Sequence, residues 1–254
     1  MKFTVDSEQL EKALTKVQLK GKGISGSGFG NTNLGNYASL YLEDNVLSIW
    51  NGNNTVAVKL NLTVEGEENG NVIIDTTKVA PYLKSFKDEV KFAVGDFIQL
   101  TTENRKASIP LVVRHPQEDS ISRMRGLLNH VSYEVQPQML FTFGKSKFEA
   151  GISLTHKQLL NAIKNCELVK TGIYKFNYHE QILSVSSRDG TSNKYEETVS
   201  PIFQLGESAT VEFSGPLYSL FEKEQMVNVY LKDDFPILMV AEDRMLVKAP
   251  QING

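Results

Sequence analysis

The sequence is poor in the residues from which disulfide frameworks, membrane spans and metal sites are built. Cysteine occurs once, at Cys166, so no disulfide forms within the chain and a reducing compartment is expected. No apolar run approaches the roughly 20 residues that a membrane helix needs. The start, Met1-Lys2-Phe3, has no signal-peptide core. We therefore expect an intracellular protein without a membrane partner.

Histidine is also scarce, and its distribution excludes the common metal sites. The four histidines show no H-x-x-x-H spacing and no ligand spacing with cysteine. They are His115, His130, His156 and His179. His156 stands beside Lys157 in an expected helix, so we expect it to face outward, toward solvent or nucleic acid. The sequence therefore predicts no metal.

An excess of charge of either sign is absent as well. Lys and Arg number 27 against 30 Asp and Glu, which gives a formal net charge of −3 over 254 residues. That balance argues against a strongly basic nucleic-acid-binding protein and against an acidic disordered tail. Hydrophobic residues at 41% and charged residues at 22% indicate a folded chain with a substantial core.

The chain does contain an internal repeat. Three short segments recur in the same order, at offsets of 149, 136 and 137 positions. The pairs are Gln9–Leu14 with Gln158–Ile163, Val46–Ile49 with Ile182–Val185, and Val90–Val94 with Val227–Leu231. The shared order and near-constant offset favour two copies of one structural unit. Because the offset drops after the first pair, the first copy carries an insertion, which we place at Gly21–Gly35, where six of the 18 glycines lie.

Each copy reads as a strand, an amphipathic helix, alternating strands, a second helix and further strands. The four expected helices span residues 7–20, 76–87, 154–166 and 216–225. The fold class is therefore α+β, with strands in the majority and two helices in each copy.

The expected helices begin with recognisable signals. Asp6 or Ser7 is expected to cap the first helix, and Ser153 the third. Pro81 and Pro216 fit the first turn of the second and fourth helices, where backbone donors have no intrahelical partner.

The two copies define two domains joined by a connector. We place the N-terminal domain at 1–114, the connector at 115–145 and the C-terminal domain at 146–254. The connector is rich in polar residues and includes two prolines. Whether Ser120–Val131 forms a short helix stays open at this level.

Positive charge is concentrated on the expected helices. They hold nine lysines and four glutamates, a balance of +5, which leaves −8 on the rest of the chain. The lysines are Lys12, Lys16, Lys20, Lys78, Lys84, Lys87, Lys157, Lys164 and Lys223. A lysine is a flexible point charge suited to non-specific phosphate contact. Two interpretations follow: solvated helix faces, or a helix-lined surface that meets the phosphates of DNA.

One glycine motif matches a nucleotide-binding pattern without the context that this pattern needs. Gly21–Gly26 reads G-x-G-x-x-G, but pyrophosphate binding requires the turn to follow a strand and open a helix. Here the motif follows an expected helix and leads into a glycine-rich loop, so we expect no cofactor and no enzymatic activity. A small-molecule-binding enzyme that uses the Gly21–Gly35 loop remains a remote alternative.

The chain resembles the DNA polymerase sliding clamps over nearly its whole length. Met1–Val5 with the helix at Gln9–Leu14 looks like the start of the bacterial beta clamp, and Leu47–Asn53 also looks like that clamp. Phe235–Val240 and Ala249–Ile252 look like the end of proliferating cell nuclear antigen (PCNA). The resemblance implies a DNA clamp fold with two clamp domains per chain, as in the archaeal or viral trimeric clamps. Six domains then make a ring, with the helices lining the hole.

The resemblance implies a DNA polymerase processivity factor that forms a homotrimer, encircles double-stranded DNA and serves replication and DNA repair in an archaeal or virus-infected cell. Polymerase, clamp loader and other partners would dock short peptides in an apolar pocket. The pocket residues carried over by position are Asn54, Thr55, Ala57, Pro236, Ala249, Pro250, Gln251 and Ile252. Lys248 stands where the family is expected to have an aromatic or apolar residue.

The sequence leaves several modes of assembly open. Edge strands near Lys106–Val113 and Ser192–Thr198 are expected to form the subunit contacts, because ring closure pairs edges that are otherwise exposed. A monomeric or dimeric accessory subunit that does not close a ring is one alternative. Assembly with a paralogue is another.

Overall fold

The structure is a computed structural model that describes most of the chain. The described residues are 1–19, 36–52, 55–112, 131–132, 142–143, 146–190, 192–214 and 220–251. They fall into two compact units, unit 1 up to residue 112 and unit 2 from residue 131 onward. Several sequence-based expectations lie outside the described residues: Lys20, the Gly21–Gly35 loop, Asn54, Pro216, Ile252, and residues 120–130 of the possible connector helix.

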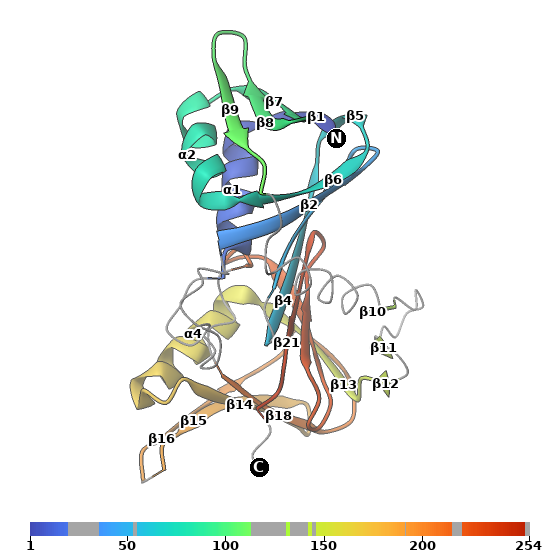
Figure 1. The fold of residues 1–254 in the computed structure, drawn as a ribbon. Helices are drawn as coiled ribbons and strands as arrows, with labels where there is room; N and C mark the ends of the chain where they lie inside the picture. The colour runs from blue at the N-terminus through green and yellow to red at the C-terminus, as the bar shows by residue number, and fades with distance from the viewer. Residues whose placement is uncertain are drawn as a thin grey trace. The chain divides into compact units, whose positions relative to one another are not determined.

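The described residues of unit 1 form nine strands and two helices (Figure 1). The elements are β1 (Lys2–Asp6), α1 (Ser7–Val17), β2 (Tyr37–Glu43), β3 (Val46–Gly52), β4 (Val56–Thr63), β5 (Glu65–Glu68), β6 (Gly70–Asp75), α2 (Thr76–Phe86), β7 (Glu89–Val94), β8 (Phe97–Thr101) and β9 (Lys106–Pro110). One antiparallel sheet has the order β5-β1-β7-β8-β9. In a second sheet, β4, β3, β2 and β6 follow one another in that order.

Unit 2 begins with three short strands that form a small sheet, β10 (Val131–Ser132), β11 (Thr142–Phe143) and β12 (Ser146–Lys147). Its further elements are β13 (Ala150–Thr155), α4 (His156–Cys166), the 3-10 turn η2 (Glu167–Val169), β14 (Ile173–His179), β15 (Ile182–Arg188), β16 (Lys194–Val199), β17 (Phe203–Gly206), β18 (Ala209–Ser214), β19 (Met226–Leu231), β20 (Ile237–Val240) and β21 (Arg244–Lys248). The strand orders are β17-β13-β19-β20-β21 and β16-β15-β14-β18.

Unit 2 repeats unit 1 strand by strand, which confirms the internal repeat predicted from the sequence. Strand β1 pairs with β7 so that Phe3 lies opposite Phe92, and β13 pairs with β19 so that Ile152 lies opposite Val229. The two pairs are related by the offsets of 149 and 137 found in the sequence. The hairpins β2–β3 and β14–β15 likewise match in register at an offset of 136.

Each unit buries the apolar face of its first helix against strands of one sheet. Helix α1 packs on β3 and β4 and against α2, and α4 packs on β15 and β16. The buried face of α1 holds the expected stripe Leu10, Ala13, Leu14 and Val17. Burying a large apolar side chain of this kind stabilises the fold by about 1.5–3 kcal/mol. Among the described residues, no helix has the length and apolar character that a membrane span needs.

Candidate functional site

Helices α1 and α2 each begin at an aspartate that caps the helix with its side chain. The carboxylate of Asp6 accepts a 2.8 Å hydrogen bond from the amide of Gln9, and that of Asp75 accepts one of 3.0 Å from the amide of Thr77. The first amides of a helix have no intrahelical partner, so such caps contribute about 1 kcal/mol each. The prediction of a cap at Asp6 or Ser7 is confirmed for Asp6.

Pro81 lies deeper in α2 than the sequence-based expectation placed it. The helix begins at Thr76, so Pro81 falls in the second turn rather than the first. A proline there removes the hydrogen bond to the carbonyl four residues earlier, that of Thr77. Pro81 lies on the exposed face of α2, and the helix continues past it to Phe86.

The helix lysines of unit 1 are mostly exposed. They are Lys12, Lys78, Lys84 and Lys87, which are exposed, and Lys16, which is half-buried. Lys12 is 67% exposed with its Nζ 2.6 Å from a glutamate one turn away, and the Nζ of Lys78 is 3.9 Å from the cap carboxylate of α2. Lys84 and the C-cap residue Lys87 are exposed, and no described carboxylate forms an ion pair with them. Exposed ion pairs are worth about 0–1 kcal/mol, so these lysines can exchange their partners for phosphate at little cost.

The cap of α4 differs from the predicted one by two residues. Ser153 lies within β13, and its hydroxyl is 2.5 Å from Oδ1 of Asn228 on the neighbouring strand. Thr155 caps the helix instead, in a capping box with Gln158. The prediction was wrong because β13 continues to Thr155 before the helix begins.

His156 is buried, contrary to the expectation that it faces outward. It is 1% exposed, and its ring centroid lies 5.7 Å from that of Phe221. His156 precedes Leu159 and Leu160 by one turn of α4, so the helical period places all three on the buried face. Lys157 points the other way, 58% exposed, and Lys164 is also exposed on this helix.

The fourth expected helix is not helical over residues 220–225. This segment turns, and the carbonyls of Lys223 and Gln225 accept 2.8 Å hydrogen bonds from the amides of Lys157 and His156. These carbonyls therefore satisfy the open start of α4 instead of extending a helix of their own. Lys223 is exposed in a turn and does not lie on a helix face.

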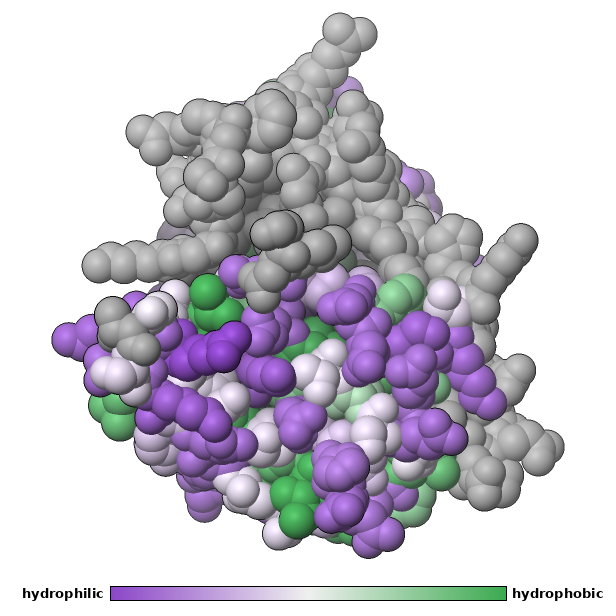
Figure 2. All heavy atoms as spheres, turned by 90° about the horizontal axis from the view of Figure 1, so that it is seen from below, coloured by the Kyte–Doolittle hydropathy of each residue, from purple (hydrophilic) through white to green (hydrophobic). Residues whose placement is uncertain are grey.

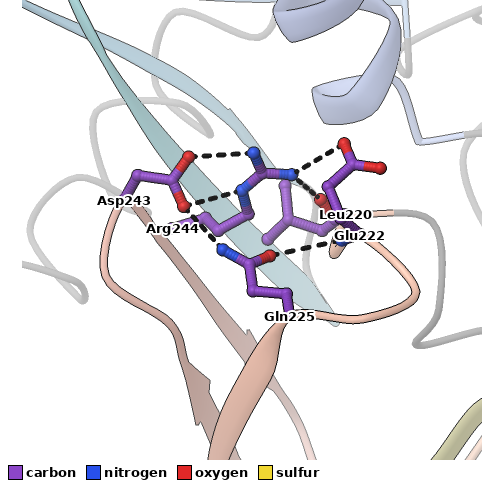
Figure 3. Close-up of polar contacts among 5 residues, drawn as sticks. All are labelled: Leu220, Glu222, Gln225, Asp243 and Arg244. Carbon is purple, nitrogen blue, oxygen red and sulfur yellow. Dashed lines mark hydrogen bonds and ion pairs between the residues drawn. The ribbon is translucent and has the colours of Figure 1, made fainter. Parts of the chain in front are cut away.

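A charged cluster, which we call the Arg244 cluster, holds this turn (Figure 3). Arg244 donates two hydrogen bonds to the carboxylate of Asp243, at 2.9 and 2.8 Å, and one of 2.7 Å to the carbonyl of Leu220. A further contact of 3.3 Å reaches the carboxylate of Glu222. The side chain of Gln225 donates to Asp243 at 2.9 Å and accepts from the amide of Glu222 at 3.2 Å.

The two charges of this cluster stabilise each other. Burial alone raises the pKa of Asp243, but the hydrogen bonds and charge of Arg244 outweigh burial and hold that pKa below its ordinary value. Burial alone lowers the pKa of Arg244, and the hydrogen bonds to Asp243 overcome it, so the pKa of Arg244 is raised. Both groups are therefore charged at neutral pH.

Sequence reasoning missed the Arg244 cluster, although the repeat contains a signal for it. Glu103-Asn104-Arg105 and Glu242-Asp243-Arg244 stand 139 positions apart and close equivalent hairpins, β8–β9 and β20–β21. A charged tripeptide retained at the same turn of both copies indicates a shared structural role.

The residues expected to bind partner peptides lie partly in each unit. Thr55 is exposed just before β4, and Ala57 is buried within that strand. Pro236 precedes β20 and Ala249 follows β21, and both are half-buried. Because β20 and β21 pair antiparallel with Ile237 opposite Lys248, Pro236 and Ala249 lie at the same end of this strand pair.

Gln251 contacts an edge strand, β18. The amide of Gln251 donates a 2.7 Å hydrogen bond to the carbonyl of Glu212 in β18, and Pro250 before it is half-buried. Lys248 is 2% exposed, and burial lowers the pKa of its ammonium group. The position expected to be apolar in the family is thus buried in this chain, but it holds a lysine.

A polar cavity of about 350 Å³ lies over β14, β15, β16 and β18. Figure 2 views the molecule from this side, where hydrophilic side chains predominate. The charged residues of the lining are Lys175, Arg188, Asp189, Lys194, Glu196 and Glu212, and no histidine or cysteine lines it. In the described part of the chain, no group of three His, Cys, Asp or Glu side chains is placed to hold a metal ion.

Comparison by sequence finds no relative, whereas comparison by structure does. No protein-family model matches the chain, and no curated protein matches its sequence. The PCNA of Thermococcus kodakaraensis matches with a TM-score of 0.69 at 13% identity, over 98% of this chain and 99% of that one. The A. fulgidus PCNA bound to the C-terminal region of FEN-1 matches with a TM-score of 0.71 at 14% identity, over 100% of this chain and 99% of that one.

A bacterial clamp subunit gives a match of the same quality over part of its length. The DNA polymerase III beta subunit of Thermotoga maritima has a TM-score of 0.72 at 15% identity, over 100% of this chain and 66% of that one. The chain thus spans about two thirds of the bacterial subunit and nearly the whole of the archaeal ones. With its two repeated units of matching strand order, the chain has the fold of the DNA sliding clamps.

Proposed function

We propose that the chain is a DNA sliding clamp, a processivity factor that encircles duplex DNA and tethers a polymerase to it. The observation that carries the proposal is the set of exposed lysines on α1, α2 and α4, in a fold shared along the full chain with PCNA. Lysines on helix faces suit contacts with phosphate that leave a protein free to move along DNA. The net charge of −3 is compatible with this function, because α2 and α4 each carry two lysines and no acidic residue, while α1 carries two lysines and two glutamates.

A ring of three copies fits the two-unit chain. Strand β9 ends the order β5-β1-β7-β8-β9, and β16 ends the order β16-β15-β14-β18, so both are edge strands of the sheets within their units. They overlap the segments expected to form the subunit contacts. Strand β9 has one charged residue, Lys106, and β16 carries Lys194 with Glu196 and Glu197. The two edge strands therefore have opposite net charges, which favours their pairing between copies.

Partner peptides would dock near the end of the β20–β21 strand pair and the C-terminal residues. Pro236 and Ala249 lie together there, and Gln251 contacts β18. One structural relative is described with a peptide of FEN-1 bound. We infer polymerase, clamp loader and repair enzymes as the partners of this surface. The protein would then act inside the cell, at the DNA.

The proposal is tested by topological retention on DNA. The protein is loaded onto a nicked circular plasmid by a clamp loader, the sample is split, and one half is linearised with a restriction enzyme before gel filtration. A sliding clamp stays with the circle and is lost from the linear DNA, since only a topological link gives that difference. Equal retention on both forms would overturn the proposal.

A mass measurement separates the ring from an accessory subunit that does not close. Three chains of 28.4 kDa give about 85 kDa by light scattering. A monomer at working concentration would refute the homotrimer while leaving the fold and the polymerase-accessory role in place.

A further inference from the structure

Equivalent arginines make the same backbone contact in the two units. The turn after β8 closes with a 2.8 Å hydrogen bond from the amide of Thr102 to the carbonyl of Arg105, and the turn after β20 with one of 2.9 Å from Ala241 to Arg244. The guanidinium of Arg105 donates to the carbonyl of Ser85. That of Arg244 donates to the carbonyl of Leu220 at 2.7 Å.

The segment that each arginine holds differs between the units. In unit 1, Arg105 binds the last turn of α2, where carbonyls lack intrahelical partners. In unit 2, Arg244 binds the beginning of the turn at 220–225, whose carbonyls accept the first two amides of α4. Arg244 therefore acts on α4 indirectly, because it binds the 220–225 turn and this turn binds the start of α4.

The cap made by this turn has a precedent in unit 1. The amide of Ser7, the first residue of α1, donates to the carbonyl of Asp88 at 3.1 Å, and the amide of His156, the first residue of α4, donates to that of Gln225 at 2.8 Å. The turn in unit 2 supplies a second carbonyl, that of Lys223, to the amide of Lys157. The start of α4 therefore depends more strongly on its turn than the start of α1 does.

The turn is also connected to the exposed lysine of α4. Glu224 lies in the turn, with its carboxylate 3.6 Å from Nζ of Lys157. The backbone and the side chain of Lys157 thus both contact the 220–225 segment. Arg244 and Asp243 bind this segment at Leu220 and Gln225 (Figure 3).

We propose that Arg244 is a positioning residue that holds the 220–225 turn, so that the turn caps α4 and places Lys157. The consequence for DNA rests on the proposed clamp function, in which Lys157 meets phosphate. Arg244 is suited to this task because its side chain is 12% exposed and its planar group binds Asp243 and the Leu220 carbonyl together. A lysine supplies the charge but not this fork of donors.

Hydrogen exchange at the amides of His156 and Lys157 tests the positioning in the full-length protein. In Arg244→Ala we expect exchange at these two amides to rise about tenfold or more, with the central amides of α4 unchanged. Arg244→Lys should give a smaller rise at the same two amides. The matched control is Arg105→Ala, which should affect the end of α2 and leave α4 as in the wild type.

Two results would overturn the inference. One is unchanged exchange at His156 and Lys157 in folded Arg244→Ala. The other is a uniform rise along all of α4, which indicates loss of global stability. If Arg244→Ala does not fold, Arg244→Lys takes its place, because it keeps the positive charge but lacks the planar group that binds Asp243 and the Leu220 carbonyl together; the same two amides must then respond.

DNA binding tests the consequence, by fluorescence anisotropy with duplex DNA at low salt. We expect Arg244→Ala to weaken binding severalfold in the wild-type background and not in a Lys157→Ala background. Equal weakening in both backgrounds would refute an action through Lys157. If the two amides respond while Arg244→Ala binds DNA as the wild type does, the positioning role stands and its consequence for DNA is refuted. The clamp function itself is overturned only by equal retention on circular and linear DNA.

Discussion

The side-chain amide of Gln18 donates a 2.7 Å hydrogen bond to the hydroxyl of Thr76, and both residues are buried. Gln18 follows the last residue of α1 and Thr76 is the first residue of α2, so this bond fastens the end of one helix to the start of the other. The Thr76 hydroxyl in turn donates to the carbonyl of Asn36 at 2.6 Å. One hydroxyl thus holds three segments that are distant in the sequence.

Replacing Thr76 by Val should therefore destabilise unit 1 by about 1–3 kcal/mol, because it leaves a buried amide and a carbonyl without their partner at nearly constant shape. Urea unfolding followed by circular dichroism measures the change. Ser85→Ala in α2 is the control, since that hydroxyl is exposed and its loss should cost less than about 0.5 kcal/mol. Equal effects of the two variants would contradict a special role for Thr76.

Removing lysines from the exposed helix faces should weaken DNA binding and flatten its dependence on salt. For the triple variant Lys12→Ala, Lys16→Ala and Lys84→Ala, we expect the slope of log K against log[salt] to fall in magnitude by about 3, because each lost phosphate contact removes close to one unit. Anisotropy titrations at several salt concentrations measure the slope.

A second triple variant controls for the loss of charge alone. Lys2, Lys91 and Lys175 lie on strands β1, β7 and β14, and their replacement by Ala removes the same charge from sheet surfaces. This variant should keep the wild-type slope. If both triple variants flatten the slope equally, overall charge and not the helix faces governs DNA binding.

The repeat made the strand register of the two units predictable, because side chains at corresponding positions are buried in the same way. Val5 lies opposite Val90 and Leu154 opposite Val227, at offsets already visible in the sequence. The burial of His156 was also predictable from the sequence, because the helical period places it on the same face as Leu159 and Leu160. The mistaken expectation for His156 came from its neighbour Lys157 instead of from the stripe it shares with Leu159 and Leu160.

The local sequence could not show that residues 220–225 are not helical, because tertiary contacts decide the conformation of this segment. The segment 220–225 has ordinary helix-forming residues, yet the carbonyls of Lys223 and Gln225 are taken by α4, and Arg244 holds that of Leu220. Local propensity is a few tenths of a kcal/mol per residue and is outweighed by such bonds. Lys223 therefore lies in a turn and not on a helix face, although the sequence grouped it with the helix lysines.

A charge in the middle of β9 should break the proposed ring. Ser108 is the central, exposed residue of this edge strand, and Ser108→Glu would place a carboxylate opposite the acidic strand β16 of the next copy. Light scattering should show a shift from trimer to monomer. Gln204→Glu on β17, the outer strand of a different sheet, is the matched control and should stay trimeric; a trimer in both variants would exclude β9 from the interface.

Cys166 should be inert in the folded protein. It is 1% exposed and its sulfur lies 3.6 Å from the carbonyl of Val185. Burial, reinforced by the negative charge of Glu197, raises the pKa of the Cys166 thiol from 9.0 to about 11. Because the thiolate is the nucleophile, alkylation by iodoacetamide at pH 8 should be about a hundredfold slower in the folded than in the urea-unfolded chain. Comparable rates in the two states would contradict this burial.

The same shift predicts a loss of stability in alkali. As pH rises, the unfolded chain releases the thiol proton near pH 9, while the folded chain keeps it to about pH 11. The stability linked to Cys166 is therefore complete below about pH 9 and declines between about pH 9 and 11. Urea unfolding across this range should show a decline that is smaller in Cys166→Ala, which lacks the titrating group. An identical pH dependence in both proteins would mean that the folded state does not hold this proton.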